Sequence, residues 1–155
     1  MIKKVLLTAL MALSLVQAAK SDTVFHDNGG HVLAAQDFQH KWVIINYWAS
    51  WCDSCLAEVP ELNNFYHDTQ QPNLVMYGVN YDHLKDAQLQ QDIKSLGIHF
   101  PVLQEDPTAI WHLGALEALP VTFIINPQGK VVKRLVGPNT ADDLKKLMQT
   151  LQASA

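Results

Sequence analysis

The chain has 155 residues, of which 48% are apolar and 17% are charged. This length allows one domain with a single core, and the composition is typical of a folded globular protein rather than a disordered one. The formal net charge of -4 argues against nucleic acid as a partner, because proteins that bind the phosphate backbone are usually basic.

The first 18 residues have the pattern of a secretory signal peptide. Lys3 and Lys4 precede a largely apolar run over residues 5–16, and residues 16–18 (VQA) form a small-residue cleavage pattern. This run is too short for a membrane-spanning helix, which needs about 20 residues. We therefore expect a signal peptide over 1–18 and one exported domain over 19–155. The alternatives are an uncleaved membrane anchor and a buried N-terminal helix.

The start of the exported domain predicts a β-hairpin. Residues 23–27 and 31–33 are β-prone, and they flank Asn28-Gly29, a strong turn signal. In such a hairpin His26 and His31 would stand opposite each other, and with two thiolates they could hold zinc. Nothing in the sequence brings the hairpin to the cysteines, so no metal site is expected.

Strands and helices alternate in the rest of the chain. Residues 42–48 (WVIINYW) are almost continuously apolar, as expected for a central strand covered on both faces. The following elements are a helix over 52–68, a strand over 74–80, a helix over 85–96, a β-prone run over 100–103, a short helix over 108–113, a hairpin of strands 121–126 and 131–136, and a helix capped by Thr140. This order predicts an α/β fold with a central mixed β-sheet flanked by helices, an N-terminal β-hairpin and a central β-α insertion.

The two cysteines, Cys52 and Cys55, are separated by only two residues. A disulfide between them would close a very small loop, which stabilises a fold least, so we expect chemistry rather than a structural staple. The pair lies where a core strand passes into a helix, and a helix N-terminus stabilises a thiolate through free amide donors and partial positive charge. Because the thiolate is the nucleophile of disulfide exchange, we expect Cys52, at the exposed tip, to attack a substrate and Cys55 to resolve the mixed disulfide.

Residues 46–55 (NYWASWCDSC) resemble the thioredoxin superfamily, and within it the TlpA/ResA/CcmG (DsbE)-like branch of exported thiol–disulfide oxidoreductases. The resemblance covers roughly residues 24–151 and includes residues 78–80 (GVN), 100–103 (FPVL) and 119–126 (LPVTFIIN). It implies a thioredoxin fold for the domain over 19–155.

The resemblance also implies a substrate-binding loop beside the two cysteines. Pro120 matches the family's cis-proline, which offers backbone to the bound partner and is counted with the catalytic residues. Trp51 and Leu119 are implied to contact the substrate at the same place. An ordinary trans proline that opens a strand is the alternative for Pro120.

Glu58 matches an acid typical of this branch, three residues after Cys55. A carboxylate there could move protons or raise a thiol pKa, which would make Glu58 catalytic. The alternative is a solvated helix residue. Two departures from thioredoxins proper lie nearby: Asn46 replaces a buried acid, and Ser54 replaces the proline common before the second cysteine.

The resulting functional hypothesis is a periplasmic reductase of disulfides in exported proteins. It would need no cofactor, act as a monomer and receive electrons from a membrane thiol–disulfide donor. The resemblance suggests cytochrome c maturation as one route. The alternatives are a disulfide-forming oxidase and a copper- or metal-handling protein, although copper handlers of this fold usually have CxxxC and a downstream histidine.

Overall fold

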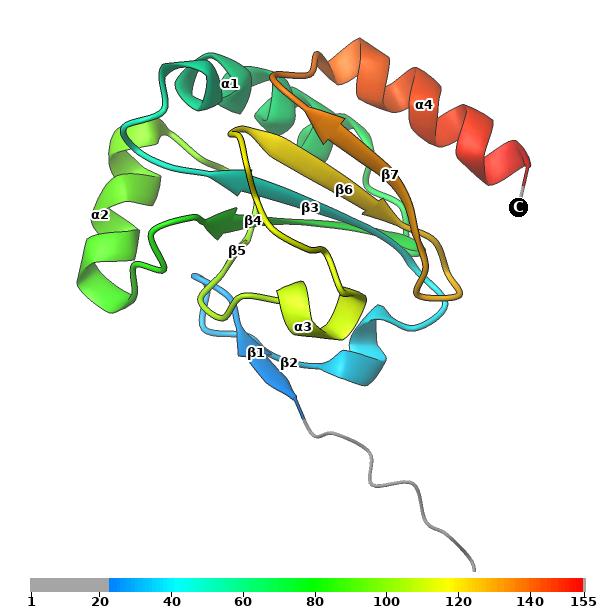
Figure 1. Ribbon diagram of the computed structural model, residues 1–155, viewed down its shortest axis with the longest axis horizontal. Helices are drawn as coiled ribbons and strands as arrows, with labels where there is room; N and C mark the ends of the chain where they lie inside the picture. The colour runs from blue at the N-terminus through cyan, green and yellow to red at the C-terminus, as the bar shows by residue number, and fades with distance from the viewer. Residues whose placement is uncertain (1–22, 155) are drawn as a thin grey trace, which may run out of the picture.

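A mixed β-sheet of five strands lies at the centre of the computed structural model, which describes residues 23–154 (Figure 1). In their order across the sheet, the strands are β5 (Val102–Leu103), β4 (Leu74–Asn80), β3 (Trp42–Trp48), β6 (Val121–Ile125) and β7 (Val131–Val136). β3 runs parallel to β4 and antiparallel to β6, and all its residues are buried. Its continuous apolar run therefore reflects a central position with both faces covered.

Helices cover one face of the sheet, and a mixed layer covers the other. α1 (Asp53–Asp68), α2 (Asp86–Leu96) and α4 (Ala141–Ala153) share one apolar cluster with the sheet. The second layer contains β1 (Val24–His26), β2 (Val32–Ala34), the 3-10 helix η1 (Ala35–Phe38) and α3 (Thr108–Trp111). Figure 1 shows α1 and α4 on one side of the sheet and the hairpin with α3 on the other. The predicted α/β fold is confirmed, including its N-terminal hairpin and the inserted segment between β4 and β6.

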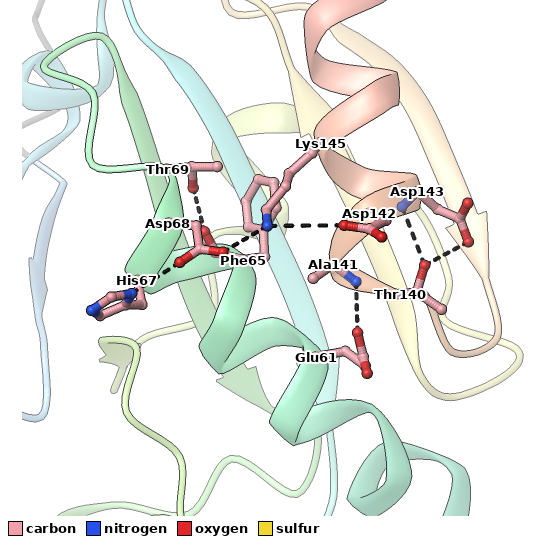
Figure 2. A network of polar contacts seen from close by, with 10 residues as sticks. All are labelled: Glu61, Phe65, His67, Asp68, Thr69, Thr140, Ala141, Asp142, Asp143 and Lys145. Atoms are coloured by element: carbon pink, nitrogen blue, oxygen red, sulfur yellow. Dashed lines mark hydrogen bonds and ion pairs between the residues drawn. The ribbon is translucent and has the colours of Figure 1, made fainter.

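Two polar contacts join α1 to α4 (Figure 2). Lys145 Nζ lies 2.7 Å from Asp68 Oδ2 at the end of α1. The backbone amide of Ala141, at the start of α4, donates to Glu61 Oε2 over 2.9 Å. These contacts hold the start of α4 against α1, and they bring Asn139, two residues before the helix, to the site described below.

Most predicted helix boundaries are close to those observed. α2 ends at Leu96 and is capped by Gly97, whose φ of 64° gives the left-handed cap that the glycine predicts. Thr140 caps α4 as expected, accepting from the amide of Asp143 over 3.2 Å. The short helix ends at Trp111 rather than at residue 113, because the next residue, His112, has a φ of 51° and leaves the helical conformation.

The predicted facing of His26 and His31 is wrong. His26 pairs with Val32, and His31 lies in the turn before β2. The reason is the buried side chain of Asp27, which accepts from the amide of His31 over 2.9 Å and from its Nδ1 over 2.8 Å, lengthening the turn. His26 Nδ1 instead contacts Glu105 Oε1 over 3.0 Å. In residues 23–154 no group of three or more His, Cys, Asp or Glu side chains could hold a metal ion.

The predicted signal peptide over 1–18 lies outside the described residues. Over residues 23–154, no helix has both the length and the apolar character needed to cross a bilayer.

Candidate active site

Cys52 and Cys55 are joined in a disulfide at the start of α1. α1 begins directly after Cys52, which is its N-cap residue, and the Sγ atom of Cys52 accepts from the amide of Cys55 over 3.2 Å. The prediction that the pair sits at a helix N-terminus is confirmed. An amide donor of the first turn therefore points at the sulfur that would carry negative charge in a reduced pair.

The two sulfurs differ in access rather than in overall burial. Cys52 is 7% exposed and Cys55 is 2% exposed. Only Cys52 lines the pocket of about 500 Å³ that opens beside the start of α1. Cys52 is thus less exposed than expected for a protruding tip, because the 116–119 loop and Trp51 stand beside it.

The loop before β6 lies against the cysteine pair. The Leu119–Pro120 peptide bond is cis, and the carbonyl oxygen of Pro120 accepts from the amide of Gly137 over 2.9 Å. The hydroxyl of Ser54 donates to the carbonyl oxygen of Leu119 over 3.4 Å, and it also lies 3.5 Å from Cys52 Sγ. Ser54 therefore bridges the cysteine pair and the proline loop, a contact that its place in the sequence did not reveal.

Trp51 follows the carboxyl end of β3, directly before Cys52, and is 63% exposed. Its indole Nε1 donates to Asp82 Oδ2 over 2.8 Å, and its ring meets that of Tyr81 edge to face, with centroids 6.1 Å apart. Sequence reasoning missed Tyr81 and Asp82. The available signal was topological: both directly follow β4, which is parallel to β3, so the carboxyl ends of the two strands meet at one edge.

Glu58 lies one turn after Cys55 in α1 and is 1% exposed. Its Oε1 accepts from the backbone amide and the side-chain Nδ2 of Asn139, over 2.8 and 2.9 Å. Its Oε2 accepts from Asn46 Nδ2 over 3.0 Å. The alternative of a solvated helix residue is wrong, because β3 supplies one partner and the segment before α4 supplies the other.

Burial raises the pKa of Glu58 above its ordinary value. The hydrogen bonds from the side chain and backbone of Asn139 and from Asn46 lower this pKa, but they do not outweigh the loss of water. All these donors are neutral amides. The carboxyl group is therefore suited to hold a proton at a higher pH than an exposed glutamate.

Comparison with known proteins agrees with this arrangement. Residues 16–134 match the AhpC/TSA family. The chain belongs to this family. The thiol–disulfide oxidoreductase ResA of Bacillus subtilis (strain 168) is 31% identical to it over 129 residues, which cover 83% of this chain and 72% of ResA.

Solved structures show the same fold. StoA from Bacillus subtilis superposes with a TM-score of 0.68 at 23% identity, covering 81% of this chain and 95% of StoA. A thiol:disulfide interchange protein of the thioredoxin family from Chlorobium tepidum superposes with a TM-score of 0.69 at 20% identity, covering 83% of this chain and 91% of that protein. The domain has a thioredoxin-like fold, and the protein is a thiol–disulfide oxidoreductase.

Proposed function

We propose that this protein reduces disulfides of exported proteins in the periplasm, with Cys52 as the nucleophile and Cys55 as the resolving thiol. The observation that carries the proposal is that Cys52, and not Cys55, lines the open pocket while capping α1. The relatives named as thiol–disulfide oxidoreductases support the reaction class.

In the proposed reaction the Cys52 thiolate attacks one sulfur of the substrate disulfide and displaces the other as a thiolate. A mixed disulfide then joins Cys52 to the substrate. The Cys55 thiolate attacks Cys52 Sγ, which forms the Cys52–Cys55 disulfide and releases the second substrate sulfur. The substrate gains two electrons and two protons, and the protein loses them. A membrane thiol–disulfide donor would restore the dithiol.

Glu58 is proposed to handle the proton of Cys55. It lies three residues along α1 from Cys55, and residues at this spacing are neighbours on a helix surface. A buried carboxyl group with a raised pKa keeps its proton to a higher pH than an exposed glutamate and can exchange it with a neighbouring thiol, and its negative form disfavours a thiolate beside it.

The cis-proline loop is proposed to hold the substrate backbone. Leu119 and Trp51 line the pocket next to Cys52, and Pro120 opens β6 directly behind them. These three residues would contact the chain on either side of the attacked cystine.

The direction of transfer is proposed to be reduction. Strong oxidants of this fold depend on a very stable thiolate, whereas Asp53, directly after Cys52, places negative charge close to the pair, and Glu58 would add to it when ionised. We expect a reduction potential nearer to thioredoxin's roughly -270 mV than to DsbA's roughly -120 mV, measured in a defined dithiothreitol buffer. A value near DsbA's, with efficient oxidation of a reduced unfolded substrate, would establish the oxidase alternative instead.

A trapping experiment tests the proposed roles and identifies substrates. Cys55→Ser should accumulate mixed disulfides through Cys52 in periplasmic extracts, whereas the matched variant Cys52→Ser should not. Apocytochrome c, the substrate class that the resemblance suggests, would appear among the adducts if cytochrome c maturation is the route. Absence of Cys52-dependent adducts on non-reducing gels would contradict a protein substrate.

A further inference from the structure

The pocket beside Cys52 has apolar walls from two separate parts of the chain. We call it the acidic groove, and it is lined by Trp51, Cys52, Asp53, Ser54, Tyr81 and residues 116–119. Its apolar walls are the two aromatic rings on one side and Leu116 and Leu119 on the other. In residues 23–154 only five large hydrophobic side chains are exposed, and Trp51 and Tyr81, at 63% and 38%, are two of them. Apolar surface exposed next to a reactive group indicates a binding site.

One aromatic wall is held in place by an acid. Asp82 Oδ2 accepts the indole proton of Trp51 over 2.8 Å, while the Tyr81 ring packs against the indole edge to face. Asp82 is exposed, so its charge faces solvent at the end of the groove next to Trp51. The wall is therefore ordered before a substrate arrives, which reduces the entropy lost on binding.

Carboxylates predominate around the acidic groove. Asp53 lines it from the start of α1 and Glu117 from the loop before β6, and Asp82 adds a third negative charge beside Trp51. None of the lining residues is Lys, Arg or His. Arg134 reaches the neighbouring loop, donating to the carbonyl oxygen of Ala115 over 3.2 Å, but neither Arg134 nor Ala115 lines the groove. The charged side chains that line the groove are thus all carboxylates, while His83, next to Asp82, lines the adjoining pocket instead.

We propose that the acidic groove selects extended polypeptide substrates that carry an apolar side chain next to the attacked cysteine and Lys or Arg in the following positions. The apolar side chain would lie between the Trp51 ring and Leu119, with the sulfur at Cys52. The cationic side chains would meet Asp82, Glu117 and Asp53 at the rim, and their charge would raise the rate of encounter. This inference rests on the proposed disulfide exchange at Cys52 and names its substrate class.

Single-turnover kinetics test the charge preference. Three synthetic peptides share one intramolecular disulfide and a Leu beside the attacked cysteine, and they differ only in carrying two Lys, two Gln or two Glu residues after it. Mixed with pre-reduced protein at low ionic strength, the Lys peptide should react at least fivefold faster than the Glu peptide, with the Gln peptide between them. The ratio should shrink as salt rises, because salt screens charges at the rim.

Charge-neutral variants locate the source of the preference. Asp82→Asn keeps a carbonyl oxygen to accept from Trp51, and Glu117→Gln keeps the size of the side chain, so each removes one charge only. Each should lower the ratio of Lys to Glu peptide rates, and the double variant should bring it below twofold. The matched control is Asp142→Asn on α4, an acid with 82% side-chain exposure, which should leave the ratio unchanged.

Binding separates this inference from the proposed function. Peptides with Ser in place of both cysteines are titrated onto the oxidised protein, and the Lys form should bind more tightly than the Glu form. If the Lys and Glu peptides reacted at equal rates and bound with equal affinity, the proposed charge selection by the acidic groove would be overturned, while the proposed disulfide reduction would stand. A ratio lowered as much by Asp142→Asn as by Asp82→Asn would also overturn it, since net charge would then be the cause. A charge preference in binding without any reduction would support the groove and contradict the reductase.

Discussion

Two carboxylates lie on opposite faces of the sheet, each bonded to one of two consecutive residues of β3. Asn46 donates to Glu58 on the α1 side, and the Tyr47 hydroxyl donates to Asp106 Oδ1 over 2.6 Å on the α3 side. Successive side chains of a strand point to opposite faces, so one short stretch of β3 serves both sites. Thr108 adds two further donors to Asp106, its amide and its hydroxyl, over 2.8 and 2.6 Å.

The two groups have similar hydrogen bonding and opposite pKa shifts. Burial raises the pKa of Glu58 and prevails over its bonds from Asn139 and Asn46. Burial also raises the pKa of Asp106, but the bonds from Thr108 and Tyr47 and the charge of His83 outweigh it, so the net pKa is lowered. Asp106 keeps 27% of its side chain exposed and has His83 Nδ1 3.9 Å away, whereas Glu58 is 1% exposed and has amide donors only. Each acid accepts three hydrogen bonds, so the deeper burial of Glu58 is the main difference between them and explains why Glu58 tends to hold a proton.

The largest expected effect is on thiol chemistry at Glu58. Glu58→Gln removes the buried acid and should slow resolution of the mixed disulfide at least tenfold, since general acid–base catalysis contributes about 10²–10⁴-fold. It should also lower at least one apparent thiol pKa in alkylation–pH curves, which report the coupled set as a whole. The matched control is Glu61→Gln, one turn further along α1, which should leave both measurements unchanged. Superimposable curves for Glu58→Gln and wild type would reduce Glu58 to a structural residue.

A smaller effect is expected on stability at Asp106. Asp106→Asn keeps an acceptor oxygen but loses the charge, and it should cost about 1 kcal/mol near neutral pH, below the roughly 1.5–3 kcal/mol of a charged hydrogen bond because the group is partly exposed. Because the folded pKa is lowered, the charge contributes stability above the ordinary value of 3.8, and this contribution is lost as the pH falls through the lowered pKa. Guanidinium unfolding should therefore show wild type and variant converging in acid. A cost that is constant with pH would contradict the charge argument.

The opposite pH trend is expected for the stability of Glu58→Gln. The raised pKa means that ionising Glu58 costs stability, a cost that is absent below the ordinary value of 4.5 and complete above the folded pKa. Glu58→Gln should therefore gain stability relative to wild type as the pH rises through that window. The Asn46 amide can turn to accept from the new amide while Thr122, now 3.0 Å from Asn46 Nδ2, donates its hydroxyl proton. If the free energies of unfolding of wild type and Glu58→Gln changed with pH in parallel, the distinction between Glu58 and Asp106 would be contradicted.

The smallest effect is expected at Ser54, where the reacting sulfur meets a neutral hydroxyl instead of an acid. In the reduced protein this hydroxyl can donate to the Cys52 thiolate, because it already lies 3.5 Å from Cys52 Sγ. Ser54→Ala should slow Cys52 alkylation at neutral pH by no more than about threefold, since one neutral hydrogen bond contributes about 0.5–1.5 kcal/mol, only part of which reaches the rate. An unchanged rate would leave the bond to Leu119 as the only role of the hydroxyl.

Features that depend on short stretches of chain could be predicted from the sequence. The apolar run of 42–48 predicts β3 because a strand covered on both faces needs apolar residues at every position. The spacing of Cys52 and Cys55 at the end of that run predicts a pair at a helix start, where the first turn supplies the amide donor. Hydrophobic periodicity and capping are local, so residues within a few positions of one another carry the signal.

Tertiary structure alone decided how these elements meet. Glu58 accepts hydrogen bonds from Asn139, 81 residues away in the sequence. Trp51 donates a hydrogen bond to Asp82, 31 residues away. The predicted register of the hairpin was also wrong, because the buried Asp27 side chain lengthens the turn and His26 therefore does not pair with His31. Local sequence does not indicate which distant side chain will contact a given residue. That is settled when helices pack on the sheet and each buried polar group must find a partner, because leaving one unpaired costs more than a single hydrogen bond contributes.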